Sequence, residues 1–132
     1  MSDVIVSICD LWKSFQKGGQ QIDVLRGISL DLSSGDRISI VGQSGSGKST
    51  LLHILGALDV PSKGTLLMMD DDGQKRDVFT FPAGQIDSIR NRMVGFIFQF
   101  HHLLPDHNAI GNVMMPLIIR GEKRSVAADR AE

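Results

Sequence analysis

The sequence of 132 residues has a single cysteine, Cys9, so no internal disulfide can form, which is typical of a protein from a reducing compartment. Cys9 lies in an alternating, strand-like segment and is predicted to be a small buried apolar residue. No apolar run approaches the roughly 20 residues that a membrane helix needs. The N-terminus MSDVIVSICD lacks a basic segment followed by an apolar core, so we expect no signal peptide and a cytoplasmic location.

An excess of charge of either sign is also lacking. The 14 Lys and Arg residues nearly balance the 15 Asp and Glu residues, and the formal net charge is −1. Nucleic-acid-binding domains usually carry a large basic excess, so the composition argues against a nucleic-acid partner. With 42% hydrophobic and 22% charged residues, the sequence has the composition of one ordinary globular domain.

Several segments rich in β-branched residues predict antiparallel strands. The first two alternate with period two and flank the Gly-Gly-Gln-Gln turn at 18–21, and the last two flank an Asp-Gly dipeptide that favours a hairpin. The predicted antiparallel strands are at 4–8, 24–32, 65–69 and 78–81. Two short continuous apolar runs, RISIV at 37–41 and VGFIF at 94–98, predict buried strands.

Helical patterns alternate with these strands. Leu51, Leu52, Leu55 and Leu58 recur at intervals of three and four, which predicts an amphipathic helix. Predicted helices lie at 48–58, at 85–93, at 109–119 with a break caused by Gly111 and Pro116, and from an N-cap at Ser125 onward. Strands that alternate with helices predict an α/β fold.

The most informative stretch is VGQSGSGKST at 41–50, where Gly42, Gly47, Lys48 and Ser49 satisfy the pattern GxxxxGK(S/T). A flexible serine-glycine linker is the alternative interpretation. Linkers do not stand between a buried strand and an amphipathic helix, however, and this stretch follows the predicted strand at 37–41 directly. The sequence therefore predicts a phosphate-binding loop that leads into a helix.

The residue types of this loop suit a nucleoside triphosphate with Mg²⁺. Glycines let consecutive backbone N–H groups approach phosphate oxygens, and the start of the helix adds partial positive charge. We expect Lys48 to reach the β- and γ-phosphates, the Ser49 hydroxyl to bind Mg²⁺, and Thr50 to bond an α-phosphate oxygen. The predicted nucleotide-binding residues of the loop are Gly42, Ser44, Gly45, Ser46, Gly47, Lys48, Ser49 and Thr50.

The loop alone leaves the class of enzyme open, because kinases, GTPases, motors and transporter ATPases all contain one. About forty residues with strand patterns precede it here, whereas many small-molecule kinases begin with the loop. The guanine-reading NKxD motif of GTPases is absent from the sequence. A soluble kinase remains an alternative on these grounds.

Taken in order along the chain, the motifs resemble those of the ATP-binding subunits of ABC transporters. Phe15, in LWKSFQKG, stands where that family has an aromatic residue that stacks on adenine. Residues 24–66 are similar to the family's run through the phosphate-binding loop and its helix, and Gln99, at the end of VGFIFQ, matches the Q-loop glutamine. The segment FHHLLPD at 100–106 is most similar to the lipoprotein-releasing subgroup, with macrolide-export and cell-division relatives close.

This resemblance implies a P-loop ATPase core with an antiparallel β subdomain at 1–100, and the Q-loop with the start of a helical subdomain at 101–132. It implies that Phe15 stacks on adenine, that Lys48 and Gln99 are catalytic, and that Gln99 joins the Mg²⁺ shell with Ser49. The alternatives are that Phe15 only covers the strand before the loop, and that Gln99 only caps a strand.

The resemblance also implies partners and a location. They are transmembrane transporter subunits and a second ATP-binding subunit, at the cytoplasmic face of the inner membrane, in a system that releases lipoproteins. The adjacent His101 and His102 have no zinc-binding spacing and are expected to contact the membrane partner.

Three family motifs are missing from the sequence: the LSGGQ signature helix, the Walker B strand and the switch histidine. The chain ends inside the helix predicted to start at Ser125, so we expect it to be the front portion of a longer protein, truncated before the signature helix and Walker B strand. Such a fragment is expected not to hydrolyse ATP efficiently and to be poorly folded or aggregated alone. A non-catalytic fragment that binds nucleotide or a partner is a further alternative.

Overall fold

The structure, a computed structural model, describes residues 3–70 and 72–132. The chain divides into two compact units, Met1–Ile86 and Asp87–Glu132, each of which is considered by itself. No helix in these described ranges is long and apolar enough to cross a membrane.

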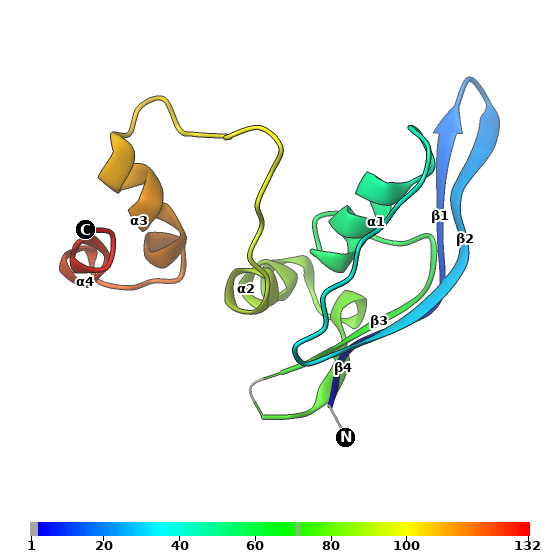
Figure 1. Cartoon of the computed structure of the whole chain (residues 1–132), viewed down its shortest axis with the longest axis horizontal. Coiled ribbons are helices and arrows are strands. Elements are labelled where there is room, and N and C mark those ends of the chain that lie inside the picture. The colour runs from blue at the N-terminus through cyan, green and yellow to red at the C-terminus, as the bar shows by residue number, and fades with distance from the viewer. Residues whose placement is uncertain (1–2, 71) are drawn as a thin grey trace. The chain divides into compact units, whose positions relative to one another are not determined.

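The first unit is built on a four-stranded antiparallel sheet with the order β2-β1-β3-β4 (Figure 1). The predicted antiparallel pair at its start is confirmed, and both strands are longer than predicted. Their pairing continues to Lys17 and Gln20, because Gly18 and Gly19 both adopt positive φ and close a two-residue turn. The strands are β1 Val4–Lys17, β2 Gln20–Ser33, β3 Lys63–Met69 and β4 Lys75–Asp77.

Helix α1, Lys48–Leu55, contacts β2 and buries Leu51 and Ile54. The predicted helix is therefore confirmed, but it ends three residues early. Gly56 caps its C-terminus, and Ala57 adopts a left-handed conformation with φ of 53° that a continuing helix cannot include.

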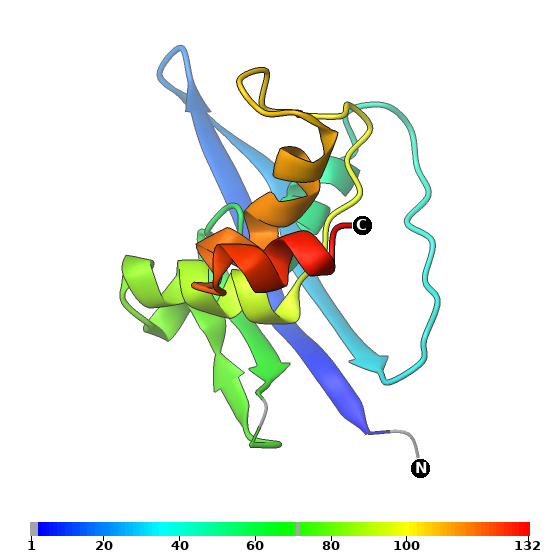
Figure 2. The same ribbon diagram turned by 90° about the vertical axis from the view of Figure 1, so that its left-hand side faces the viewer.

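Two of the predicted strands are wrong. The segments 37–41 and 94–98 are irregular, and Val41 and Ile97 are 87% and 103% exposed. Figure 2 shows the chain between β2 and α1 as a long loop that does not join the sheet. A strand needs neighbouring strands to satisfy its N–H and C=O groups, and no strand in the described ranges pairs with either segment.

The hairpin of β3 and β4 is confirmed, but its second strand is misplaced in the prediction. Strand β4 ends at Asp77, and the predicted strand at 78–81 is instead the 3₁₀ helix η1, Val78–Thr80. The Asp77 carboxylate accepts a hydrogen bond from the Phe79 N–H at 3.1 Å, which caps this short helix. Asp71, within the acidic turn, lies outside the described residues.

The prediction that Cys9 is buried is also wrong. Ile8 takes the buried face of β1, and successive side chains of a strand point to opposite faces, so Cys9 is exposed.

Helix α2, Ala83–Met93, spans the boundary between the two units and confirms the predicted surface helix, because none of its residues is buried. The second unit continues with α3, Ala109–Ile119, and α4, Arg124–Asp129, which pack on each other and bury Met114 and Ala127 (Figure 1).

Helix α3 is continuous, so the predicted break is wrong. The Asn108 side chain accepts a hydrogen bond from the Gly111 N–H at 2.8 Å, which satisfies a donor of the first turn. Pro116 removes only one bond of the helix, and its own carbonyl still accepts from Arg120. The start of α4 is also corrected: Lys123, not Ser125, is the N-cap residue, because Gly121 (φ 88°) reverses the chain and Arg124 is already helical.

Candidate phosphate-binding site

The loop that precedes α1 needs glycine at two positions. Gly45 and Gly47 have φ of 81° and 91°, a conformation that favours glycine. A Cβ on Gly47 would lie 3.0 Å from side-chain carbons of both Val24 and Leu25. The absence of a side chain at Gly47 therefore lets the start of α1 lie close against β2.

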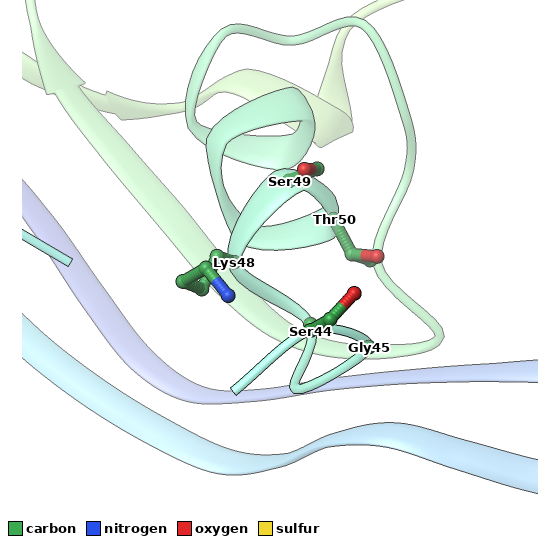
Figure 3. A pocket seen from close by; sticks show the side chains of 6 residues that line it. Ser44, Gly45, Lys48, Ser49 and Thr50 are labelled. Carbon is green, nitrogen blue, oxygen red and sulfur yellow. The ribbon is translucent and has the colours of Figure 1, made fainter. Parts of the chain in front are cut away.

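These residues surround a pocket of about 230 Å³ at the N-terminus of α1. Figure 3 shows Ser44 and Gly45 in the turn, with Ser49 and Thr50 on the first turn of the helix. The Lys48 ammonium points back to the loop and donates to the carbonyls of Gly42 and Gln43 at 2.9 and 2.7 Å. The pocket is lined by Ser44, Gly45, Gly47, Lys48, Ser49 and Thr50.

The pocket fits a polyphosphate with Mg²⁺ by the chemistry of its groups. The first N–H groups of a helix have no acceptor within the helix, and the helix dipole places partial positive charge there. Lys48 adds a full positive charge, and its two carbonyl contacts are exposed, so phosphate oxygens can replace them. Hydroxyl oxygens such as those of Ser49 and Thr50 can bind Mg²⁺ or a phosphate oxygen.

Six of the predicted loop residues are thus brought together around one pocket. Gly42 contributes a carbonyl that accepts from Lys48, and Ser46 does not line the pocket, its Oγ standing 2.8 Å from where a Cβ of Gly42 would be. Gln99 is exposed and belongs to the second unit, so it is not placed relative to the loop.

Phe15 is not one of the pocket-lining residues. It lies on β1 opposite Ile22 and is 43% exposed. On the paired strand β2, Asp23 lies opposite Ser14 and accepts hydrogen bonds from Gln21 at 2.8 Å and Ser14 at 2.7 Å, and these bonds hold the pKa of its carboxyl below the usual value. The Asp23 carboxylate is therefore ionised at neutral pH.

Sequence reasoning missed Lys13, whose ammonium stands 5.0 Å from the centroid of the Phe15 ring and 2.6 Å from a carboxylate oxygen of Asp59. The spacing of two residues on a strand puts Lys13 and Phe15 on one face and could have indicated the first contact. No local pattern indicates the ion pair, because its partners are 46 residues apart.

The second unit has its own pocket, of about 920 Å³, between the segment at 98–107 and α3. Most of its lining is apolar, and the histidines expected to contact a partner, His101 and His102, both belong to it. The lining residues are Phe98, His101, His102, Leu103, Leu104, Pro105, His107, Ala109, Asn112, Val113, Met115, Pro116 and Ile119.

Asn112 gives this pocket its shape. Its Oδ1 accepts from the Leu104 N–H at 2.8 Å, and its Nδ2 donates to the carbonyls of Leu104, His107 and Asn108 at 3.2, 3.0 and 3.0 Å. One side chain on α3 therefore fixes the backbone of the loop before the helix.

Replacing Asn112 with alanine is expected to remove all four of these bonds and to loosen the loop at 104–108, with a loss of about 1–3 kcal/mol in local stability. Hydrogen exchange at the Leu104 amide measures this effect and should become faster. Asn91→Ala is the matched control, since the Asn91 side chain accepts a single long bond from Arg120 at 3.3 Å. Unchanged exchange at Leu104 would contradict the role given to Asn112.

Comparison with known proteins covers the phosphate-binding loop and the segment around Gln99. A family model described as ABC transporter matches residues 25–132, which include the phosphate-binding loop and Gln99. The chain belongs to the ABC transporter family. The fold prediction of an ATP-binding core of this family with an antiparallel β subdomain is thereby confirmed.

Individual relatives of this ABC transporter chain agree with the family match. It is 48% identical over 124 residues to the lipoprotein-releasing system ATP-binding protein LolD of Geobacter metallireducens, covering 94% of this chain and 53% of that protein. It is 46% identical over 132 residues to the macrolide export ATP-binding/permease protein MacB of a Shewanella species, covering 100% of this chain and 20% of that protein. The chain therefore spans about half the length of the LolD relatives that it matches.

A solved structure has a similar fold. The dimeric ATP-binding cassette MJ0796, in a post-hydrolysis state bound to ADP and Pi, superposes with a TM-score of 0.83 at 32% identity, covering 96% of this chain and 54% of that chain.

Proposed function

We propose that this chain is the ATP-binding part of an ABC transporter ATPase and that it holds the triphosphate of ATP·Mg²⁺ in the loop at 42–50. The observation that carries this proposal is the pocket in which the start of α1, two glycines with positive φ and the Lys48 ammonium meet. Lys48 exchanges its contacts with the carbonyls of Gly42 and Gln43 for contacts with phosphate oxygens.

The other groups have separate tasks. Ser49 offers its hydroxyl oxygen to Mg²⁺, and Thr50 bonds an α-phosphate oxygen. Bound Mg²⁺ neutralises part of the triphosphate charge. Phe15 provides an exposed ring on which adenine stacks, and Gln99, an exposed side chain on the loop before α3, orients water or joins the Mg²⁺ shell.

For the whole protein, we propose a pair of ATP-binding subunits that act on transmembrane subunits from the cytoplasmic face of the inner membrane. The dimeric state of the similar solved cassette supports the pairing. The apolar pocket beside His101 and His102 offers a surface for the membrane partner. Seven LolD relatives and the segment FHHLLPD favour lipoprotein release as the process driven, and the MacB relative makes macrolide export the competing proposal.

Titration of the chain with a fluorescent ATP analogue in the presence of Mg²⁺ tests the proposal. We expect one saturable site per chain, competition by unlabelled ATP and by inorganic tripolyphosphate, and weaker binding after chelation of Mg²⁺. A phosphate-release assay on the chain saturated with ATP should show no efficient hydrolysis. Crystals soaked in magnesium nucleotide that show no density at the loop at 42–50, but density elsewhere, would rule the proposal out.

A further inference from the structure

Lys13 makes three contacts that together fix its ammonium group. The nitrogen donates to a carboxylate oxygen of Asp59 at 2.6 Å and to the carbonyl of Val60 at 2.7 Å, and it stands 5.0 Å from the centroid of the Phe15 ring. The side chain of Lys13 is only 12% exposed, so its alkyl stem is packed as well.

The partners of Lys13 are held in place themselves. The Asp59 carboxylate also accepts from the Val60 N–H at 2.8 Å, which fixes its orientation in the turn after α1. That turn follows the helix whose first residue is Lys48, so the ion pair joins β1 to the far end of the helix that begins at the phosphate-binding loop. Lys13 and Phe15 are two residues apart on β1 and lie on one face of it.

From this arrangement we propose that Lys13 is a positioning residue for the nucleotide base, because it holds the Phe15 ring by one face and leaves the other face for a purine. The inference rests on the proposed function, since it assumes that ATP binds at the adjacent loop. A cation over one face of a ring is attracted to the π electrons and draws them toward itself. The opposite face then repels the π electrons of a stacked purine less, so stacking becomes more favourable.

Lys13→Met tests this role, since methionine keeps an unbranched apolar stem and removes the charge. We expect ATP to bind about three- to tenfold more weakly, the range of a partly desolvated cation–π contact, while inorganic tripolyphosphate binds as it does to the unmodified chain. Lys13→Arg is the matched control, because a guanidinium can keep both the ion pair and the ring contact, and it should bind both ligands normally. Isothermal titration of the unmodified chain and of both variants with each ligand in Mg²⁺ measures the six affinities.

The same substitution in a Phe15→Ala background separates positioning from general stabilisation. If Lys13 acts through the ring, Lys13→Met causes no further loss of ATP affinity once the ring is absent. Equal weakening for ATP and tripolyphosphate, or an unchanged loss in the Phe15→Ala background, would overturn the inference. Failure of the unmodified chain to bind either ligand would instead overturn the proposed function, and with it this inference.

Circular dichroism checks that the variants are folded. Should Lys13→Met unfold the chain, Asp59→Asn gives a second route, because it keeps the lysine and weakens its anchor. ATP affinity should then fall while tripolyphosphate affinity stays the same, and equal losses for both ligands would overturn the inference.

Discussion

Replacing Lys48 with methionine is expected to weaken ATP binding by roughly 10- to 100-fold. Its ammonium provides the full positive charge among the residues that line the phosphate pocket, and a hydrogen bond to a charged group contributes about 1.5–3 kcal/mol, which corresponds to that range. Titration of the variant with a fluorescent ATP analogue in Mg²⁺ measures the loss.

Stability should change little in the same variant. The two bonds that Lys48 makes without ligand go to exposed carbonyls, which water can satisfy when the ammonium is removed. Lys75→Met on β4 is the matched control, because it removes an equal charge from an exposed position of the sheet. Equal affinities for Lys48→Met, Lys75→Met and the unmodified chain would show that the ammonium at 48 does not hold phosphate.

The phosphate-binding loop could be predicted from sequence because everything that forms it is local. Gly47 must precede the helix, Lys48 must be its first residue, and the hydroxyls of Ser49 and Thr50 follow in the same turn. The long hairpin of β1 and β2 could be predicted for a similar reason, since Gly18 and Gly19 mark the turn and alternation marks both strands.

The remaining features depend on partners far along the chain. Apolar runs at 37–41 and 94–98 predicted strands, but hydrophobicity reports that a segment can be buried and not which strand will pair with it. The ion pair of Lys13 with Asp59 joins residues 46 apart, and the local sequence around either residue does not predict it. Asn112 differs, because Leu104 is only eight residues away, but the bond still depends on how the loop folds back against α3, which no local pattern shows.

Replacing Gly64 with alanine, which adds one methyl group, is expected to destabilise the fold more than the same change at the other glycines. Gly64 has φ of 89° in β3, and a Cβ there would stand 2.3 Å from the carbonyl oxygen of Asp10 and 2.6 Å from that of Cys9. Both obstacles are backbone atoms of β1, at the irregularity between Cys9 and Trp12 where the register of the two strands shifts. Neither can rotate away as a side chain could, so the strands must separate. Gly64→Ala should therefore lower the free energy of unfolding by about 3–5 kcal/mol, measured by urea denaturation.

The matched control is Gly73→Ala, whose φ of 74° is similar but whose Cβ would meet nothing within 4 Å. That variant should lose only the cost of a left-handed alanine, about 1–2 kcal/mol. The difference between the two variants isolates the contact of β3 with β1, and equal losses would mean that the strands can adjust to the methyl group. Because Lys13 and Phe15 follow the same irregularity on β1, Gly64→Ala should also weaken ATP binding more than tripolyphosphate binding in the fraction that remains folded, whereas Gly73→Ala should leave both unchanged.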